Sequence, residues 1–97
     1  MSAGKSVAVL IKDRDRHSEG VRFSLGLLLE RHEVTLVMLG LPLTLTEDEL
    51  DNLGFIDEMG GARLSDHPGN VERHGFVQTS VEQLTRSLDR YDLVVAI

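Results

Sequence analysis

Two short segments of the sequence concentrate side chains that could bind or transform a small molecule. In the first, residues 12–18, the side chains of Arg14, Arg16 and His17 could hold an anion at the start of a helix. The segment lacks the glycine spacing of a phosphate-binding or dinucleotide-binding loop. It is therefore either a solvated loop with local ion pairs or a ligand contact, and His17 itself is expected at the surface or at a helix end.

The second segment, residues 66–79, combines a turn sequence with two histidines. Asp66, His67 and Asn70 surround a Pro-Gly pair, and His74 follows seven residues after His67. Pro-Gly favours a turn, so we predict a loop in which Asp66 or Asn70 bonds to nearby backbone. The histidine spacing matches no standard metal site, and we predict no metal and no cofactor. His67 could act as an acid or base near neutral pH, but without an identifiable nucleophile we assign no catalytic residue.

Apolar runs indicate the strands that must position these segments. Residues 7–11 form a continuous apolar run, which is typical of strands buried on both faces, and 33–39 and 92–97 repeat the pattern. A weaker strand is expected at 62–65. Helical patterns separate the runs, which predicts a single α/β domain over residues 1–97. We expect a three-layer sandwich around a mostly parallel sheet of four or five strands, with flavodoxin-like topology. Ligands of such sheets bind beyond the carboxyl ends of the strands. Residues 12–18 and residues 66–79 each come directly after a predicted strand, so both lie in that region.

The first predicted helix has apolar residues on two sides. Ser18 is expected to cap a helix that runs from Glu19 to about His32. Phe23 and Leu27 point roughly opposite to its buried face, so either the helix is covered on two sides or these residues meet another subunit. We take Phe23 and Leu27 as a candidate oligomer interface. The buried face itself follows helical spacing and consists of Val21, Leu25, Leu28 and Leu29.

Two capping boxes predict where the later helices begin. Thr46 with Glu49 marks the start of the second helix, and Thr79 with Glu82 marks the start of the last one. In the last helix, Leu84 belongs to the expected buried stripe. A glycine at position 54 is expected to weaken or interrupt the second helix.

The charge distribution bears on partners. Sixteen acidic and ten basic residues give a net charge of −6, which argues against nucleic-acid binding. The stretch from 46 to 58 contains no basic residue. It is either a solvated helix face or a docking surface for a basic partner. It holds six of the acids, namely Glu47, Asp48, Glu49, Asp51, Asp57 and Glu58.

No apolar run approaches the roughly 20 residues that span a bilayer, so we expect no membrane association. The first five residues lack the pattern of a signal peptide, and the protein is expected to be cytoplasmic.

Taken as a whole, the chain resembles the DsrE/DsrF-like family, which includes the small sulfur-relay subunits of the Tus and Dsr type. The resemblance extends over nearly all 97 residues and rests on general patterning. The stretches that carry it are Val7–Ile11, Ser18–Leu29, His32–Gly40, Gly60–Leu64, Glu72–Phe76 and Tyr91–Ile97.

The resemblance implies a small three-layer α/β subunit that packs into homotrimers or homohexamers, or into hetero-oligomers with cysteine-bearing relatives. Active members carry a cysteine after the third or a nearby strand, and that cysteine accepts sulfur as a persulfide. His67 lies at or near this position, and the chain has no cysteine. An imidazole cannot hold a persulfide. We therefore expect a non-catalytic structural or regulatory subunit; the alternatives are an anion-binding module and, more remotely, an enzyme that uses His67.

Overall fold

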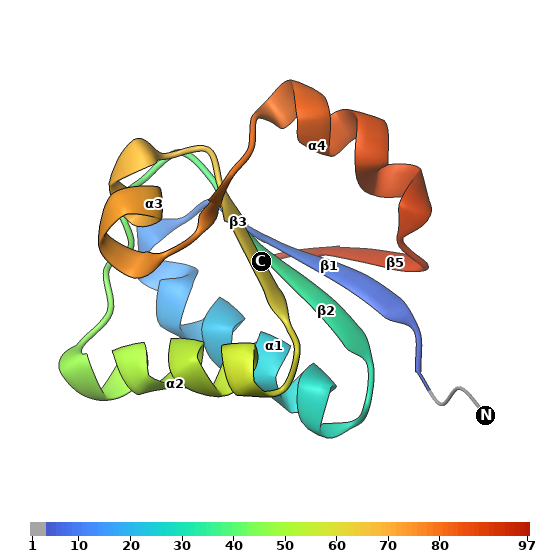
Figure 1. Cartoon of the computed structure of the whole chain (residues 1–97), viewed down its shortest axis with the longest axis horizontal. Helices are drawn as coiled ribbons and strands as arrows, with labels where there is room; N and C mark the ends of the chain where they lie inside the picture. Colours follow the sequence, from blue (N-terminus) through green and yellow to red (C-terminus); the bar gives the residue numbers. More distant parts are fainter. Residues whose placement is uncertain (1–3) are drawn as a thin grey trace.

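The computed structural model describes residues 4–97, and Figure 1 shows the path of the chain. The expectation about the N-terminus rests partly on residues 1–3, which lie outside the described residues. Strands and helices alternate as predicted. In chain order they are β1 (Ser6–Ile11), η1 (Arg14–Arg16), α1 (His17–Leu29), β2 (Glu33–Met38), α2 (Glu47–Glu58), β3 (Ala62–Ser65), α3 (Pro68–His74), β4 (Val77–Gln78), α4 (Val81–Ser87), η2 (Leu88–Arg90) and β5 (Leu93–Ala96).

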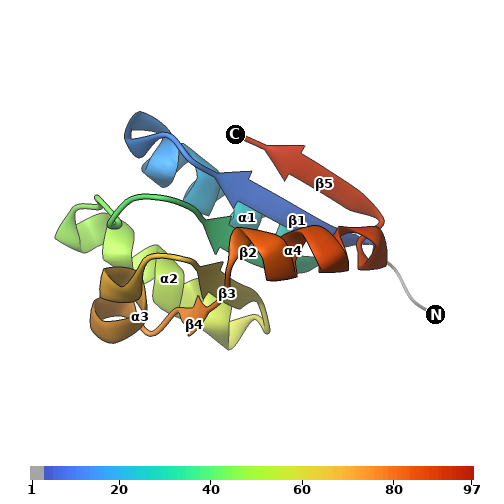
Figure 2. The same cartoon turned by 90° about the horizontal axis from the view of Figure 1, so that it is seen from above.

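The five strands form one sheet in the order β4-β3-β2-β1-β5, and every neighbouring pair is parallel. Helices α1 and α2 lie against one face of the sheet, and α4 crosses above the other face, as Figure 1 and, from above, Figure 2 show. The predicted α/β class is confirmed: one parallel sheet flanked by helices, consistent with a flavodoxin-like sandwich. The carboxyl ends of β1, β2 and β3 consequently share one edge, and the segments that follow them are neighbours.

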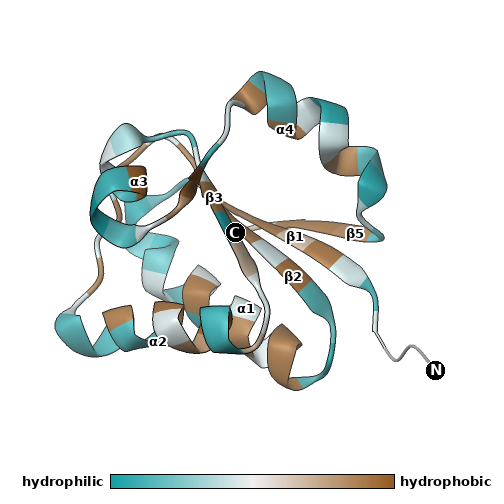
Figure 3. Cartoon of the chain, viewed as in Figure 1, coloured by the Kyte–Doolittle hydropathy of each residue, from teal (hydrophilic) through white to brown (hydrophobic). Residues whose placement is uncertain are grey.

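The core lies between the sheet and the helices α1 and α2. Alternate residues of β1 and β2 point into it, including Val9 and Leu36, which are fully buried, and Figure 3 shows the hydrophobic residues gathered along the strands. Each buried branched side chain contributes about 1.5–3 kcal/mol to folding. Gly20 of α1 lies directly against Ile11, where a Cβ atom would overlap that side chain. Helix α1 can therefore pack closely on β1.

The start of α1 differs from the prediction. The 3-10 turn η1 continues straight into α1, so the His17 amide donates to the Arg14 carbonyl and Ser18 lies inside the helix rather than at its cap. The Ser18 hydroxyl donates instead to the Glu49 carboxylate of α2. Helix α1 also ends at Leu29, which is 68% exposed, so its assignment to the buried face is wrong.

The two residues taken as a candidate interface have different surroundings. Leu27 is partly buried and packs against the core cluster, which accounts for its apolar side chain within a single chain. Phe23 remains 40% exposed. Of the two, Phe23 is the residue that a single chain leaves uncovered.

Helix α2 begins with the predicted capping box. The Thr46 hydroxyl accepts from the Glu49 amide, and the Glu49 carboxylate accepts from the Thr46 amide. The helix continues through Gly54 without a break, so the expected interruption is wrong. Packing of Leu53 and Ile56 on the core offsets the cost of the glycine, about 1 kcal/mol.

The last capping box is displaced by one residue. Ser80, not Thr79, caps α4 and accepts from the amide of Gln83, so the predicted box of Thr79 with Glu82 is wrong. Leu84 is buried as expected. A hydroxyl at either of two adjacent positions can cap a helix, and the sequence pattern alone does not separate them.

Residues 66–79 are more ordered than the predicted loop. They contain α3 and the two-residue strand β4, which pairs with β3. Pro68 begins the helix, and Gly75, with φ of 72°, ends it in the left-handed conformation. Proline at the first helical position and glycine after the last are a standard pair of helix boundaries, and here they outweigh the tendency of Pro-Gly to form a turn.

Within residues 4–97, the helices are all too short or too polar to cross a bilayer.

Candidate functional site

A buried amide connects the ends of β2 and β3. Asn70 of α3 is 1% exposed, and its Oδ1 accepts from the Leu43 amide at 2.7 Å. Its Nδ2 donates to the Leu41 carbonyl and to Ser65 Oγ, both at 3.0 Å. Ser65 Oγ in turn donates to the Met38 carbonyl at 2.7 Å. These bonds fix residues 39–46, which we call the pocket loop, against the start of α3.

Asp66 and His67 support the same arrangement. Asp66 Oδ1 accepts from the Gly40 amide at 2.8 Å. His67 caps α3, because its Nδ1 accepts from the Gly69 amide at 3.0 Å. A backbone amide can only donate, so the proton of a neutral His67 ring lies on Nε2, which remains a free hydrogen-bond donor. The predicted bonding of Asp66 and Asn70 to backbone is present, although the partners lie across the site rather than nearby in sequence.

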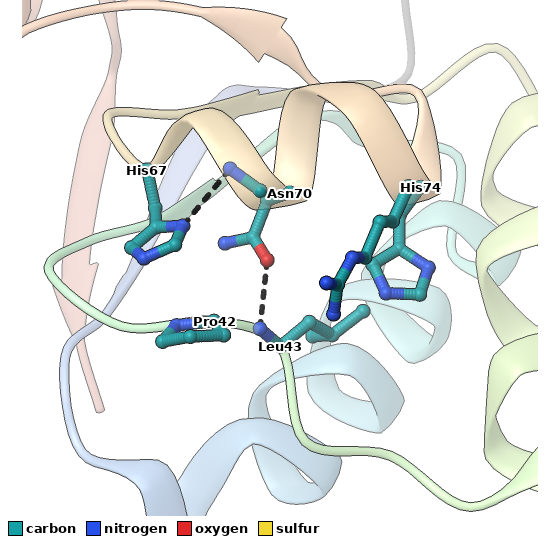
Figure 4. Close-up of a pocket in the computed structure, with 7 residues that line it drawn as sticks. Pro42, Leu43, His67, Asn70 and His74 are labelled. Carbon is teal, nitrogen blue, oxygen red and sulfur yellow. Dashed lines mark hydrogen bonds between the residues drawn. The ribbon is translucent and has the colours of Figure 1, made fainter.

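A pocket of about 160 Å³ opens between α3 and the pocket loop. Figure 4 shows His67 and His74 along α3 with Asn70 between them, above Pro42 and Leu43 of the loop. The remaining lining residues are Gly69 and Arg73. His67, Asn70 and His74 have the i, i+3, i+7 spacing of one helical face, so the helix itself brings the two histidines to the same opening.

Nitrogen donors and cations dominate the pocket chemistry. Arg73 is an exposed guanidinium, and the imidazoles of His67 and His74 are half-buried. Burial, followed by the charges of Arg63 and Arg73, lowers the pKa of His74 from its usual range. The amide of Asn70 already uses its oxygen and nitrogen within the protein. The lining thus offers an incoming molecule donors and positive charge, with no carboxylate.

Arg63 holds the far end of α3 in place, a role that the sequence analysis missed. Its guanidinium pairs with both carboxylate oxygens of Asp57, at 2.9 and 2.8 Å, and donates to the His74 carbonyl at 2.6 Å. It also lies over the Phe76 ring, 4.8 Å from the centroid. The Arg63 side chain is only 10% exposed, whereas that of Asp57 is 51% exposed, so water reaches the ion pair from the carboxylate side. A lone arginine in a short predicted strand gave no indication of this arrangement.

The first predicted segment is built differently. His17 is the first residue of α1, so the helix-end position that was one of its two expected places is confirmed, but the residue is fully buried rather than at the surface. Its Nδ1 lies 3.1 Å from the Thr44 amide and 3.2 Å from Thr44 Oγ1. Arg14 and Arg16 remain exposed, and Arg16 lies 3.9 Å from Glu19. The His17 ring and the Arg14 carbonyl contact Thr44 of the pocket loop, and none of the three residues lines the pocket. The two predicted segments therefore contact the same loop at different residues and do not form one site.

Sequence analysis missed Arg73 as a pocket residue and considered His74 only as a metal ligand. Both follow from recognising α3, because Pro68 and Gly75 together would have predicted a helix with His67 and His74 on one face. Across residues 4–97, no group of three or more histidine, aspartate or glutamate side chains is placed to hold a metal ion. Searches of protein-family models, curated proteins and solved structures gave no match to the chain.

Proposed function

We propose that the protein is a non-catalytic, DsrE/DsrF-like regulatory subunit that binds a small oxyanion in the pocket between α3 and the pocket loop. The observation that carries this proposal is the lining: Arg73 and two imidazoles face one opening without a carboxylate. A guanidinium and imidazole N–H groups are suited to carboxylates and tetrahedral oxyanions. The location, beyond the carboxyl ends of β2 and β3, is where open parallel sheets bind ligands.

The resemblance to sulfur-relay subunits supports a role in binding rather than in sulfur transfer. His67 is the second residue after β3, in the region where the resemblance places the sulfur-accepting cysteine of active relatives, and it lines the pocket. Its Nδ1 is occupied by the Gly69 amide. With no thiol in the chain, this position can donate a hydrogen bond but cannot carry a persulfide.

Thermal unfolding with inorganic phosphate, sulfate or acetate tests the proposal, with sodium chloride at equal ionic strength as the reference. We expect at least one of the three anions to raise the Tm with saturation, because a ligand of the folded state stabilises it. Arg73→Ala should abolish the rise, while the double variant Arg14→Ala/Arg16→Ala should retain it. No saturable rise with any anion, or equal loss in both variants, would overturn the proposal.

A purely structural subunit is the second candidate, and the exposure of Phe23 favours it. A phenylalanine that is 40% exposed on a core helix is a suitable contact in a trimer or hexamer. Native mass spectrometry should then show a multimer that Phe23→Asp disperses. Leu29→Asp is the matched control, because Leu29 is exposed at the end of the same helix but is not part of the proposed interface. A monomeric wild-type protein at micromolar concentration would remove this candidate.

A further inference from the structure

His17 is a buried histidine that does not line the proposed pocket. Its ring is fully buried, and the Thr44 amide donates to Nδ1 at 3.1 Å. The Thr44 hydroxyl can donate to the Arg14 carbonyl, 3.4 Å away, so the amide determines the tautomer. The neutral ring therefore carries its proton on Nε2, and this nitrogen finds no partner within residues 4–97. A buried donor without a partner destabilises the arrangement that contains it.

The surroundings of His17 are unfavourable for a second proton. Burial and then the charge of Arg14 in η1 lower the pKa of the ring. Residues 39–46, which pack against it, contain no ionisable side chain. Glu49 of α2 approaches α1 at Ser18, where its carboxylate accepts the serine hydroxyl. Asp13, Asp15 and Glu19, the acids nearest to His17 in sequence, are exposed, and within residues 4–97 no carboxylate is hydrogen-bonded to the His17 ring.

Protonation would remove the bond that His17 makes. An imidazolium has two donors and no acceptor, so Nδ1 could no longer accept from the Thr44 amide. Thr44 belongs to the pocket loop, one residue after Leu43, which lines the pocket. Leu41 and Leu43 remain bound to Asn70, so the loop would loosen from its Thr44 end while the protein stays folded.

We propose that His17 is a pH-sensitive clamp that closes the pocket loop at neutral pH and loosens it in acid, weakening the retention of a bound oxyanion. The first part of this inference concerns the free protein, and only the effect on the oxyanion rests on the proposed function. In the loosened state the ring titrates near its ordinary value of about 6.5, whereas in the closed state it resists protonation. The clamp is therefore fully closed above about pH 6.5 and opens as the pH falls below it.

Amide hydrogen exchange between pH 7.5 and 5.0 tests the clamp without any ligand. The protection factor of the Thr44 amide should be constant above about pH 6.5 and then fall by up to about tenfold for each pH unit. The Leu43 amide, bound to Asn70, should keep its protection and serves as an internal control. Equal behaviour of the two amides, or constant protection of Thr44, would overturn the inference.

His17→Asn supplies the matched variant, because its Oδ1 can accept from the Thr44 amide and does not titrate. In this variant the protection of Thr44 should no longer depend on pH. His32→Asn is the control, since His32 Nδ1 also accepts a backbone amide, that of Lys5 at 3.1 Å, but at the opposite end of the sheet. If His17→Asn does not fold, NMR titration of the ring nitrogens in the wild type decides: titration of His17 at or above its ordinary pKa contradicts the clamp.

Phosphate binding at two pH values separates the clamp from the proposed function. The ratio of phosphate affinity in His17→Asn to that in the wild type should be near one at pH 7.5 and at least about threefold at pH 5.5. A pH-dependent Thr44 amide with no phosphate, sulfate or acetate binding would leave the clamp standing and remove the oxyanion pocket. Phosphate binding with a ratio of one at both pH values would leave the oxyanion pocket standing and overturn the effect of His17 on the bound anion.

Discussion

Residues 12–18 and residues 66–79 both follow strands at the same edge of the sheet, and both contact the pocket loop, but they bury opposite kinds of groups. After β1, the imidazole of His17 is buried and the arginines are left in solvent. After β3, the amide of Asn70 is buried and the imidazoles of His67 and His74 face a pocket. A buried amide can satisfy every donor and acceptor without changing charge. A buried imidazole loses its acceptor nitrogen when it binds a second proton.

The two segments therefore hold the pocket loop in different ways. Asn70 holds the pocket loop independently of pH and leaves two histidines free for a ligand. His17 holds the same loop through a bond that exists only while the ring is neutral. In the account proposed above, the segment after β3 binds the oxyanion, and the segment after β1 makes closure of the pocket loop depend on pH.

Removal of the Asn70 amide should have the largest effect. Asn70→Ala deletes three hydrogen bonds and leaves the buried Ser65 hydroxyl and the part-buried backbone groups of Leu41 and Leu43 without this partner, so we expect a loss of about 2–4 kcal/mol in the free energy of unfolding. Urea denaturation measures it. Asn52→Ala, at the chain's other asparagine, should cost much less, and equal costs would show that Asn70 has no special role.

A pH change should produce the next largest effect. Because the folded-state pKa values of His17 and His74 are lowered, the unfolded chain binds more protons below about pH 6.5. The free energy of unfolding should be at its full value above that pH. Below it, the free energy of unfolding should fall as the pH decreases, by at most about 1.4 kcal/mol per pH unit for each histidine. Denaturation of the wild type and of His17→Asn at pH 7.5 and 5.5 should show a smaller decrease in the variant. An unchanged decrease would contradict the assignment of His17.

A single methyl group at position 69 should disturb the pocket with a smaller change in stability. A Cβ there would lie 3.0 Å from Nδ1 and Cε1 of His67, so Gly69→Ala must displace the ring. We expect a loss of about 1 kcal/mol or less in stability and a several-fold weaker response to phosphate. Gly26→Ala is the control, because nothing lies within 4 Å of a Cβ at that position. A phosphate response that Gly69→Ala leaves intact would show that the His67 ring does not contact the anion.

The smallest effect on stability should come from the exposed arginines. Arg73→Ala and the double variant Arg14→Ala/Arg16→Ala should each change stability by no more than about 0.5 kcal/mol. Isothermal titration with phosphate should nevertheless separate them, with binding lost only in Arg73→Ala. The double variant removes more positive charge, so preserved binding there would exclude a general electrostatic effect. The opposite pattern would move the site to the segment after β1.

The sequence predicted the positions of β1, β2, β3 and β5, because apolar runs leave few alternatives, but Leu93 and Val94 of β5 are 50% and 40% exposed, so the predicted burial of that strand on both faces is wrong. The strand at 62–65 has the predicted bounds, and 7–11 lies within β1. Helix α3 was missed because Pro68-Gly69 is also a common turn sequence, and the second boundary signal, Gly75 after the last helical residue, was not combined with it. The burial of His17 could not be predicted either, since the bond that compensates it comes from Thr44, 27 residues away.

The most direct test of the account is an NMR titration of the wild-type protein with inorganic phosphate at pH 7.5, followed by backbone amide shifts. We expect saturable shifts concentrated in residues 67–74 and in Leu43 of the pocket loop, with residues 12–16 unaffected. Shifts centred on residues 12–16, or no saturable shift in either region, would contradict the claim that the pocket after β3 binds an oxyanion.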